Sequence, residues 1–399
     1  MENQFLGRSL RESYILAISC VIASLITAWS STALATEGVA ADKKASYPSV
    51  PGELIVRTRT AKGIFQSSLV RSVVNVLGRG DDDAHFATFK TDDHLGLVKL
   101  TRADSRDLVM KTLKSHPEVE IVEPNYLLTV QGWRDENKSI GAGSPASNIT
   151  ATIPARAAAG VPNDPDFAKT WGLSNTGQTD AAGQVGTAGS DIEVLDLWAK
   201  GQTGSRDILV AVIDTGIDWQ HPDLVDNLYT NPGESGALAS NGKDDDGNGY
   251  IDDVHGWNFN TNTNNSDDDH DHGTHCAGTI GASGDNGLGV AGVNWKVSLL
   301  PVKFLSASGS GSTAGAIESI NYARKMKARV MSNSWGGGAF SDTLKKAIDD
   351  AEKAGILFVA ASGNDGLGTP SYPAWYEVSN IVAVAATDNR DLAAKFSNV

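Results

Sequence analysis

The sequence contains few cysteines. Cys20 and Cys276 are the two among 399 residues, and Cys20 lies in a segment that we expect to be removed. A chain left with a single thiol cannot form an intramolecular disulfide, so a disulfide scaffold is excluded. Other interactions must therefore stabilise the exported fold.

Basic residues are missing from a long internal stretch. No Lys or Arg occurs between Asp244 and Trp295, although this stretch holds several runs of aspartate. The whole chain has a formal net charge of −15 and a pI near 4.9. These values argue against nucleic acid or an anionic membrane surface as a partner. Clustered carboxylates of this kind occur in solvated loops or in sites for hard cations.

The N-terminus has the pattern of an export signal. Arg8 and Arg11 precede an apolar run at residues 14–29, and residues 33–35 (Ala-Leu-Ala) suit a signal peptidase. We expect residues 1–35 to be removed, which leaves a secreted, extracellular protein with no stable membrane anchor. A retained anchor is the competing interpretation, but the run is short for a bilayer span.

Two linkers flank a compact pattern. We expect linkers at residues 36–51 and 131–160, the second flexible because it is rich in Gly, Ala, Ser and Asn. Between them, residues 52–130 are predicted to form strands at 53–57, 87–89, 97–100 and 119–122 and helices at 67–77 and 106–114. This βαββαβ order indicates a small α+β, ferredoxin-like unit.

A different pattern occupies residues 161–399. Strands are predicted at 207–213, 299–305, 329–333, 356–361 and 381–386, with helices at 313–326 and after the N-cap Ser341. Alternating strands and helices predict an α/β domain with a parallel sheet.

Four polar motifs follow predicted strands or begin a predicted helix. They are centred on Asp214 (VIDTGID), His272 (HGTHCAGT), Ser334 (SNSWGG) and Asn364 (AASGNDG). Each alone has an ordinary structural explanation, since an Asp at a strand end often only caps a turn. In a parallel sheet, however, functional residues gather beyond the carboxyl ends of the strands.

Together these motifs resemble those of the subtilisin-like serine proteases, in the order of that family. The resemblance covers about residues 161–399 and implies a three-layer parallel-sheet domain that hydrolyses polypeptides. It assigns the triad aspartate to Asp214, the general base to His272 and the oxyanion-hole amide to Asn364. It places substrate-binding residues at Ser334, Trp335, Gly336, Ala361, Ser362 and Gly363. General chemistry agrees, because a serine hydroxyl needs a base and that base needs a carboxylate to orient it.

The preceding unit resembles the inhibitory pro-segment of the same family, on residues 53–56 and 122–126. The resemblance implies that residues 52–130 assist folding and act as an intramolecular inhibitor until they are cleaved. A generic small α+β domain is the alternative.

The nucleophilic serine is not found. In the family it lies in a Gly-Thr-Ser motif after the stretch that matches residues 396–398, and this sequence contains no Gly-Thr-Ser. We therefore expect the peptidase domain to be incomplete, its C-terminal part missing, and the 399-residue chain to be inactive. The alternative is a catalytically dead, subtilase-like binding protein.

Two further alternatives involve the histidine motif. Cys276 could act as a thiol nucleophile beside His272, since residues four apart share a helix face. His270, His272, His275 and Cys276 could bind zinc, but their spacing matches no common zinc pattern.

Calcium is the cofactor that the sequence favours. Asp244, Asp246, Asn248, Tyr250 and Asp252 match the first nine positions of an EF-hand-like loop, although His255 stands where the bidentate Glu would be. A solvated acidic turn is the alternative. The family resemblance implies a second calcium site at Asp223 and the loop 284–290, which includes Asn286.

Overall fold

The computed structural model describes residues 47–61, 74, 84–100, 103–131 and 160–399. The export signal and most of both linkers lie outside these residues. So does the helix expected at 67–77, apart from Val74, which is helical and buried. No helix of the described ranges is both long and apolar enough to cross a membrane.

The N-terminal unit, which we call the pro-domain, is an antiparallel sheet with a helix against it. Its strands are β1 (Ser49–Thr58), β2 (Ala84–Phe89), β3 (Asp92–Leu100) and β4 (Val119–Val130), in the order β4-β1-β3-β2. A short turn, η2 (Ala103–Ser105), leads into helix α4 (Arg106–Lys114). β1 begins inside the expected linker, and β4 continues well past the expected end at residue 122.

Alternate residues of the pro-domain strands belong to two different cores. Leu54 and Val56 cluster with Val109 of α4, whereas Ile55 and Leu128 belong to the core of the C-terminal domain. Successive side chains of a strand point to opposite faces. One face of the small sheet is therefore its own core, and the other packs on the rest of the chain.

The C-terminal domain is built on a six-stranded sheet in the order β12-β11-β9-β5-β7-β6, with every pair parallel. Its strands are β5 (Gly204–Asp214), β6 (Trp257–Asn258), β7 (Lys296–Lys303), β9 (Val330–Asn333), β11 (Leu357–Ala361) and β12 (Ile381–Val384). The α-helices are α5 (Leu195–Trp198), α6 (His272–Gly281), α7 (Thr313–Lys325) and α8 (Asp342–Lys353). Short elements are β8 (Ser310–Ser312), β10 (Trp335–Gly336), η4 (Phe167–Lys169), η5 (Val225–Asn227), η6 (Pro232–Glu234) and η7 (Gly236–Leu238).

The helices cover both faces of this sheet. Ala211 and Ile213 of β5 cluster with Ile317 of α7, whereas Val212 clusters with Ala277 of α6. Because neighbouring residues of a strand face opposite ways, α6 and α7 lie on opposite sides. The three-layer α/β architecture is therefore confirmed.

Helix α8 begins as the sequence predicts. The Ser341 hydroxyl accepts a hydrogen bond from the backbone N–H of Leu344 at 3.0 Å, which is the expected N-cap. The predicted buried positions of this helix, Leu344, Ala347, Ile348 and Ala351, are all buried.

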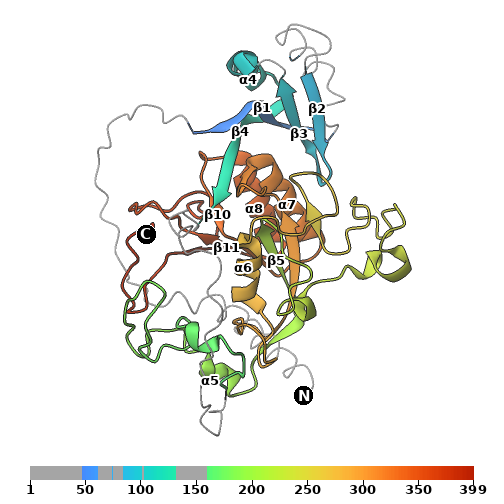
Figure 1. Cartoon of the computed structure of the whole chain (residues 1–399). Coiled ribbons are helices and arrows are strands. Elements are labelled where there is room, and N and C mark those ends of the chain that lie inside the picture. The colour runs from blue at the N-terminus through green and yellow to red at the C-terminus, as the bar shows by residue number, and fades with distance from the viewer. Residues whose placement is uncertain (1–46, 62–73, 75–83, 101–102, 132–159) are drawn as a thin grey trace, which may run out of the picture.

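The pro-domain sheet lies over α7 and α8, and β4 runs from it towards β10 (Figure 1). Two side chains of β4 bind the first turns of these helices. The Glu123 carboxylate accepts hydrogen bonds from the Ser341 hydroxyl at 2.6 Å, the Asp342 N–H at 3.1 Å and the Thr343 hydroxyl. The Asn125 side-chain oxygen accepts one from the N–H of Ala314 at 3.0 Å. Both acceptors satisfy helix N–H groups that have no partner within their own helix.

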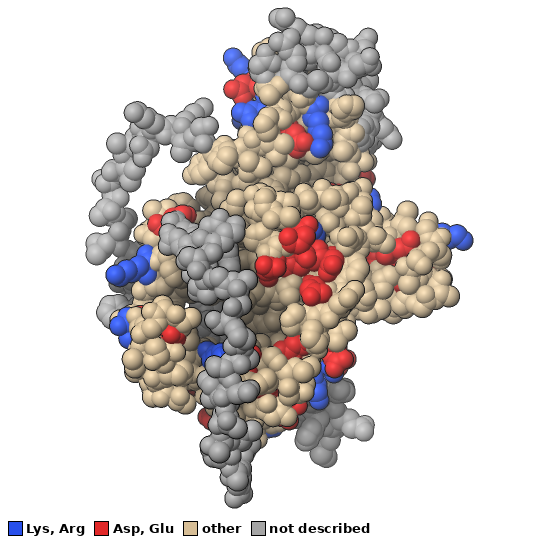
Figure 2. Space-filling view, viewed as in Figure 1, with Lys and Arg blue, Asp and Glu red and all other residues tan. Residues whose placement is uncertain are grey.

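Acidic side chains gather near the centre of the face drawn in Figure 2, and basic ones lie nearer its edges.

Candidate active site

Asp214 and His272 meet beyond the carboxyl end of β5. Asp214 is the last residue of this strand and is fully buried, and His272 is the first residue of α6. Nδ1 of His272 lies 2.7 Å from Oδ1 of Asp214. The same oxygen accepts a hydrogen bond from the N–H of Thr215 at 2.7 Å. This arrangement fixes the orientation of the imidazole and keeps a hydrogen on its Nδ1.

Residues before and after His272 hold the start of α6 in place. The Asp268 carboxylate accepts hydrogen bonds from the N–H and the hydroxyl of Thr274, at 2.8 and 2.7 Å. Burial works to raise the pKa of Asp268, but these hydrogen bonds outweigh it and lower that pKa. Gly273 is required, because a Cβ there would collide with the carbonyl oxygen of Gly216. Sequence reasoning missed Asp268, although an acidic residue shortly before a helix is a recognisable cap signal.

Strand β4 occupies a groove beside His272. Its residues 127–129 pair antiparallel with β8, and Thr129 and Val130 pair with β10. The next residue, Gln131, donates its N–H to the carbonyl oxygen of Ser334 at 2.8 Å. The Gln131 carbonyl oxygen then lies 3.1 Å from Nε2 of His272. The groove thus holds an extended peptide between two edges, with one carbonyl group at the imidazole.

The neighbours of His272 favour a protonated imidazole. Asp214 and the Gln131 carbonyl are both acceptors, so each ring nitrogen must carry a hydrogen to bond them. Burial works to lower the pKa of His272, but the hydrogen bond and the charge of Asp214, together with Cys276, outweigh burial and raise it. Both contacts therefore favour the imidazolium, the form that the ring has after it takes a proton.

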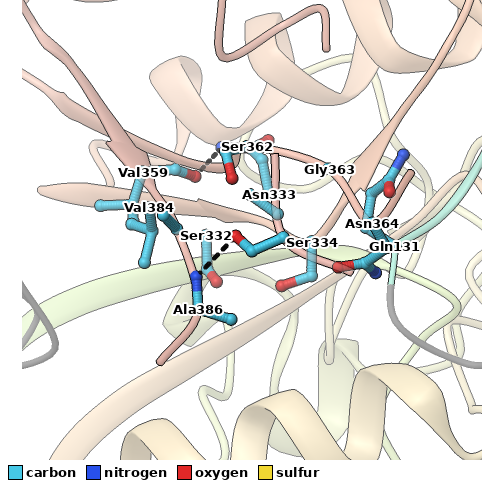
Figure 3. Close-up of a pocket in the computed structure, with 13 residues that line it drawn as sticks. Gln131, Ser332, Asn333, Ser334, Val359, Ser362, Gly363, Asn364, Val384 and Ala386 are labelled. Atoms are coloured by element: carbon cyan, nitrogen blue, oxygen red, sulfur yellow. Dashed lines mark hydrogen bonds between the residues drawn. The ribbon is translucent and has the colours of Figure 1, made fainter. Parts of the chain in front are cut away.

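A pocket opens beside Gln131. It has a volume of about 270 Å³ and lies between the ends of β9, β11 and β12 (Figure 3). Its lining consists of Gln131, Ser332, Asn333, Ser334, Val359, Ala361, Ser362, Gly363, Asn364, Val384, Ala385, Ala386 and Ser397. None of these residues carries a charged side chain. The pocket therefore suits an uncharged side chain of a bound peptide.

The structure brings most of the predicted substrate-binding residues to this pocket. Ser334, Ala361, Ser362 and Gly363 line it, as does Asn364, the predicted oxyanion-hole residue. Three further observations refine their roles. Gly336 pairs with Thr129 of β4. The Ser362 hydroxyl donates to the Asn398 carbonyl oxygen at 2.7 Å. Trp335 is fully buried and packs on Phe304, with ring centroids 5.0 Å apart, so only its backbone faces the groove.

Cys276 lies on the Asp214 side of the imidazole. Its sulfur is 3.9 Å from Nδ1 of His272, whereas the bound peptide carbonyl is at Nε2. A thiol nucleophile would have to reach that carbonyl group from the opposite edge of the ring. Asp214, His272 and Cys276 do place three potential ligand atoms within 4.8 Å of one another, a different set from the zinc ligands that we considered.

The acidic loop after η7 gathers carboxylates around a residue that the sequence reasoning missed. Oxygens of Glu234, Asp244 and Asp246 lie within 4.8 Å of one another. Glu234 is fully buried, and its Oε2 has no hydrogen-bond partner among the described residues. A buried carboxylate oxygen without a donor is unfavourable, and a bound cation or water would relieve that cost. Glu234 lies ten residues before the aspartates, so the loop spacing gave no signal for it.

Other residues of the predicted EF-hand-like set have different neighbours. Asn248 donates its side-chain N–H to Asp246 at 3.1 Å and accepts from the N–H of Tyr250 at 2.8 Å, so it closes the loop. Asp252 accepts hydrogen bonds from the N–H groups of Asn241 and Gly242, at 3.0 Å each. Tyr250 buries its ring in the core. Glu234, Asp244 and Asp246 therefore form a candidate ligand set that shares two aspartates with the EF-hand-like pattern.

The residues of the second predicted calcium site lie next to one another. Asp223 accepts hydrogen bonds from the Asn286 side chain at 2.8 Å and from the N–H of Val290 at 3.0 Å. Asp164, which was not predicted, accepts from the N–H of Asp285 at 2.7 Å and is buried. Its Oδ1 has no hydrogen-bond partner in the described part of the chain. Among the described residues, the Asp164 oxygen therefore lacks a donor in the same way as Oε2 of Glu234.

A parallel-sheet α/β domain that brings an aspartate, a histidine and a peptide groove together at its strand ends defines a hydrolase-type site. The comparisons with known proteins identify the class more narrowly. Residues 205–399 match the model of the subtilase family. This stretch, just under half of the chain, is therefore similar to the domain of the subtilase family.

Three relatives illustrate the match. The chain is 36% identical to "Thermitase" of Thermoactinomyces vulgaris over 188 residues, 47% of this chain and 58% of thermitase. It is 39% identical to "Subtilisin Savinase" of Lederbergia lenta over 198 residues, 50% of this chain and 62% of Savinase. A "Thermophilic serine proteinase" of Bacillus sp. (strain AK1) is 28% identical over 357 residues, 89% of this chain and 68% of that protein. The chain spans about six tenths of the length of the first two.

Proposed function

We propose that this chain is part of a secreted serine endopeptidase of subtilisin type, made as a zymogen. In this proposal Asp214 and His272 are two members of the triad, and a serine beyond residue 399 is the third. Among the described residues, Nε2 of His272 contacts the Gln131 carbonyl oxygen and no serine hydroxyl. The 399 residues alone are therefore expected to be inactive.

The single observation that supports this most strongly is the position of Gln131. Its carbonyl oxygen lies 3.1 Å from the proposed general base, its N–H is bound by Ser334, and the uncharged pocket is beside it. A substrate residue that precedes the cleaved bond would have its N–H and its side chain bound in this way, with its carbonyl group close to the catalytic residues. A strand held on both edges is also how an extended peptide binds by β-pairing.

The residues have distinct roles in the proposed reaction. His272 takes the proton of the serine hydroxyl as it attacks the peptide carbonyl and later gives it to the leaving amine. Asp214 keeps the imidazole oriented and stabilises its charged form. The Asn364 amide, at the pocket, would donate to the oxyanion, a contact whose loss typically lowers turnover by roughly 10²–10³-fold.

The pro-domain is proposed to inhibit the enzyme by remaining in the groove. Since Gln131 holds the position before the cleaved bond, the bond between Gln131 and Gly132 is the proposed processing junction. Cleavage there would leave β4 bound as a product, so inhibition would outlast the cleavage itself.

Calcium is proposed to stabilise the enzyme at two loops. Oxygens of Glu234, Asp244 and Asp246 fit a hard cation, as do those of Asp223 and Asp164 near Asn286. In each group one buried carboxylate oxygen has no donor. The ion would supply positive charge to these loops and take no part in hydrolysis.

The test compares two purified proteins on a peptide substrate. One is the 399-residue chain and the other is an extended chain that contains a downstream Gly-Thr-Ser motif. We expect hydrolysis only by the extended chain. Hydrolysis by the 399-residue chain would overturn the assignment of the nucleophile. An inactive but folded extended chain would favour a binding protein instead.

A further inference from the structure

The pro-domain contacts the C-terminal domain at a place outside the substrate groove. The turn between β2 and β3 inserts Phe89 into the C-terminal core, where it is 5% exposed. The next residue, Lys90, extends its ammonium over two aromatic rings. Its Nζ lies 4.7 Å from the ring centroid of Tyr250 and 4.6 Å from that of Trp257. The backbone N–H of Lys90 donates to the Glu318 carboxylate at 3.3 Å.

The aromatic walls of this contact are fixed by their own packing. The ring of Tyr250 meets those of Trp257 and Tyr322 edge to face, with centroids 5.1 and 4.8 Å apart. Tyr250 and Trp257 are at most 5% exposed. Because packing already fixes these rings, they lose no further rotamer freedom when they bind a cation.

The charges suit a lysine side chain. Burial raises the pKa of Glu318, and the backbone hydrogen bond and positive charge of Lys90 lower it again. Burial lowers the pKa of Lys90, while Glu318 and Asp244 raise it. A compact ammonium on an apolar stem can contact two ring faces and remain near a carboxylate. An uncharged side chain at this position would leave the half-buried Glu318 carboxylate without a nearby cation.

We propose that Tyr250, Trp257 and Glu318 form a lysine-binding exosite that anchors the pro-domain through Lys90. This proposal rests on the proposed function only in treating the pro-domain as the inhibitor. The exosite then adds to the other contacts of the pro-domain, which are β4 in the groove, the helix caps at Glu123 and Asn125, and the packed face of its sheet. Cleavage of the chain near Gln131 leaves the exosite contact intact, so the exosite slows release of the cleaved pro-domain.

Amide hydrogen exchange of residues 84–100 tests the exosite without any need for peptidase activity. The background is the 399-residue chain with His272→Ala, in which the pro-domain stays covalently attached. Variants are Lys90→Met, Glu318→Gln and the double change, with Lys111→Met at an exposed position of α4 as the matched control. Exchange of β5 and β7 reports whether the C-terminal domain is intact.

We expect Lys90→Met to speed exchange of residues 84–100 by roughly threefold to tenfold, the size of a partly desolvated cation–π contact. Lys111→Met should change nothing, and Glu318→Gln should add little once Lys90 is gone. Equal exchange in the Lys90→Met and Lys111→Met chains would overturn the proposal. So would full additivity of the Lys90 and Glu318 changes. If Lys90→Met also speeds exchange in β5 and β7, Glu318→Gln is compared with Lys111→Met instead. Equal exchange of residues 84–100 in those two chains would then overturn the proposal. Failure of the proposed peptidase function would appear in the peptide hydrolysis assay and not in these hydrogen-exchange rates.

Discussion

The carbonyl oxygen of Gln131 lies 3.1 Å from Nε2 of His272, and the Asp214 carboxylate holds the other nitrogen of the ring at 2.7 Å. The imidazole is thus placed between an acid of the C-terminal domain and the last described residue of the pro-domain. This relationship defines both where the chain is expected to be cut and why the site is closed before cleavage.

The first prediction is the position of that cut. In an extended, active chain the mature N-terminus should be Gly132, because the Gln131 carbonyl is the one at the base. Intact-mass and N-terminal analysis of the matured protein measure it directly. His272→Ala and Asp214→Asn should each stop self-cleavage. Normal maturation of either variant would show that the triad assignment is wrong.

The second prediction concerns pH. The pKa of His272 is raised in the folded state by Asp214, so its contribution to stability is fully present below the ordinary histidine value of about 6.5. It is lost as the pH rises through the raised pKa, because a neutral ring can donate from only one nitrogen. Melting temperatures from neutral to alkaline pH should therefore fall more in the 399-residue chain than in its His272→Ala variant. Parallel curves would rule out this source of stability.

The pairing of Asp214 with His272 illustrates what the sequence could predict. An apolar strand run that ends in Asp and a helix that begins at His are local signals, and the parallel topology brings their ends together. Glu234 and Asp164 could not be found in this way. Each reaches its site through the path of a loop. That path depends on packing between distant residues, which the spacing of residues along the sequence does not predict. Lys90 was missed for a similar reason, since the rings beneath it come from a distant segment.

The third prediction is the specificity of the pocket. Its lining carries no charged side chain and consists largely of small residues such as Ala361, Gly363 and Ala386. The extended enzyme should therefore cleave many sequences, with a bias to large apolar residues before the cut bond. Sequencing of fragments from a denatured protein mixture gives the profile. A profile dominated by Lys or Arg at that position would contradict the prediction.

The fourth prediction concerns the cap that the pro-domain provides to α8. Glu123→Ala leaves the Ser341 and Thr343 hydroxyls and the N–H of Asp342 without their acceptor. Unpaired buried donors cost about 1–3 kcal/mol each, so the docked pro-domain should be strongly destabilised. Hydrogen exchange over β4 in the 399-residue chain measures the loss. Glu120→Ala is the matched control, because this residue of the same strand forms a half-exposed ion pair with Arg57. Equal effects of the two changes would mean that the cap contributes little.

The last prediction is that calcium stabilises the fold through Glu234, Asp244 and Asp246. Three carboxylates whose oxygens lie within 4.8 Å repel one another, and a divalent cation reverses that repulsion. An ion that binds only the folded state adds about 2.7 kcal/mol at a hundredfold excess over its dissociation constant. A chelator should therefore lower the melting temperature of the chain.

Two variants test whether the calcium effect comes from this loop or from the second candidate calcium site. Asp246→Ala should reduce the effect of the chelator, because it removes one carboxylate of the cluster. Asp245→Ala should preserve it, since this exposed side chain bonds Asn241 outside the cluster. Each protein is melted with calcium and with chelator, and the difference between the two curves is compared. Identical curves for the unmutated chain would mean that no structural calcium binds. A difference that Asp246→Ala leaves unchanged would assign the ion to Asp223 and Asp164, because those residues belong to the second candidate calcium site.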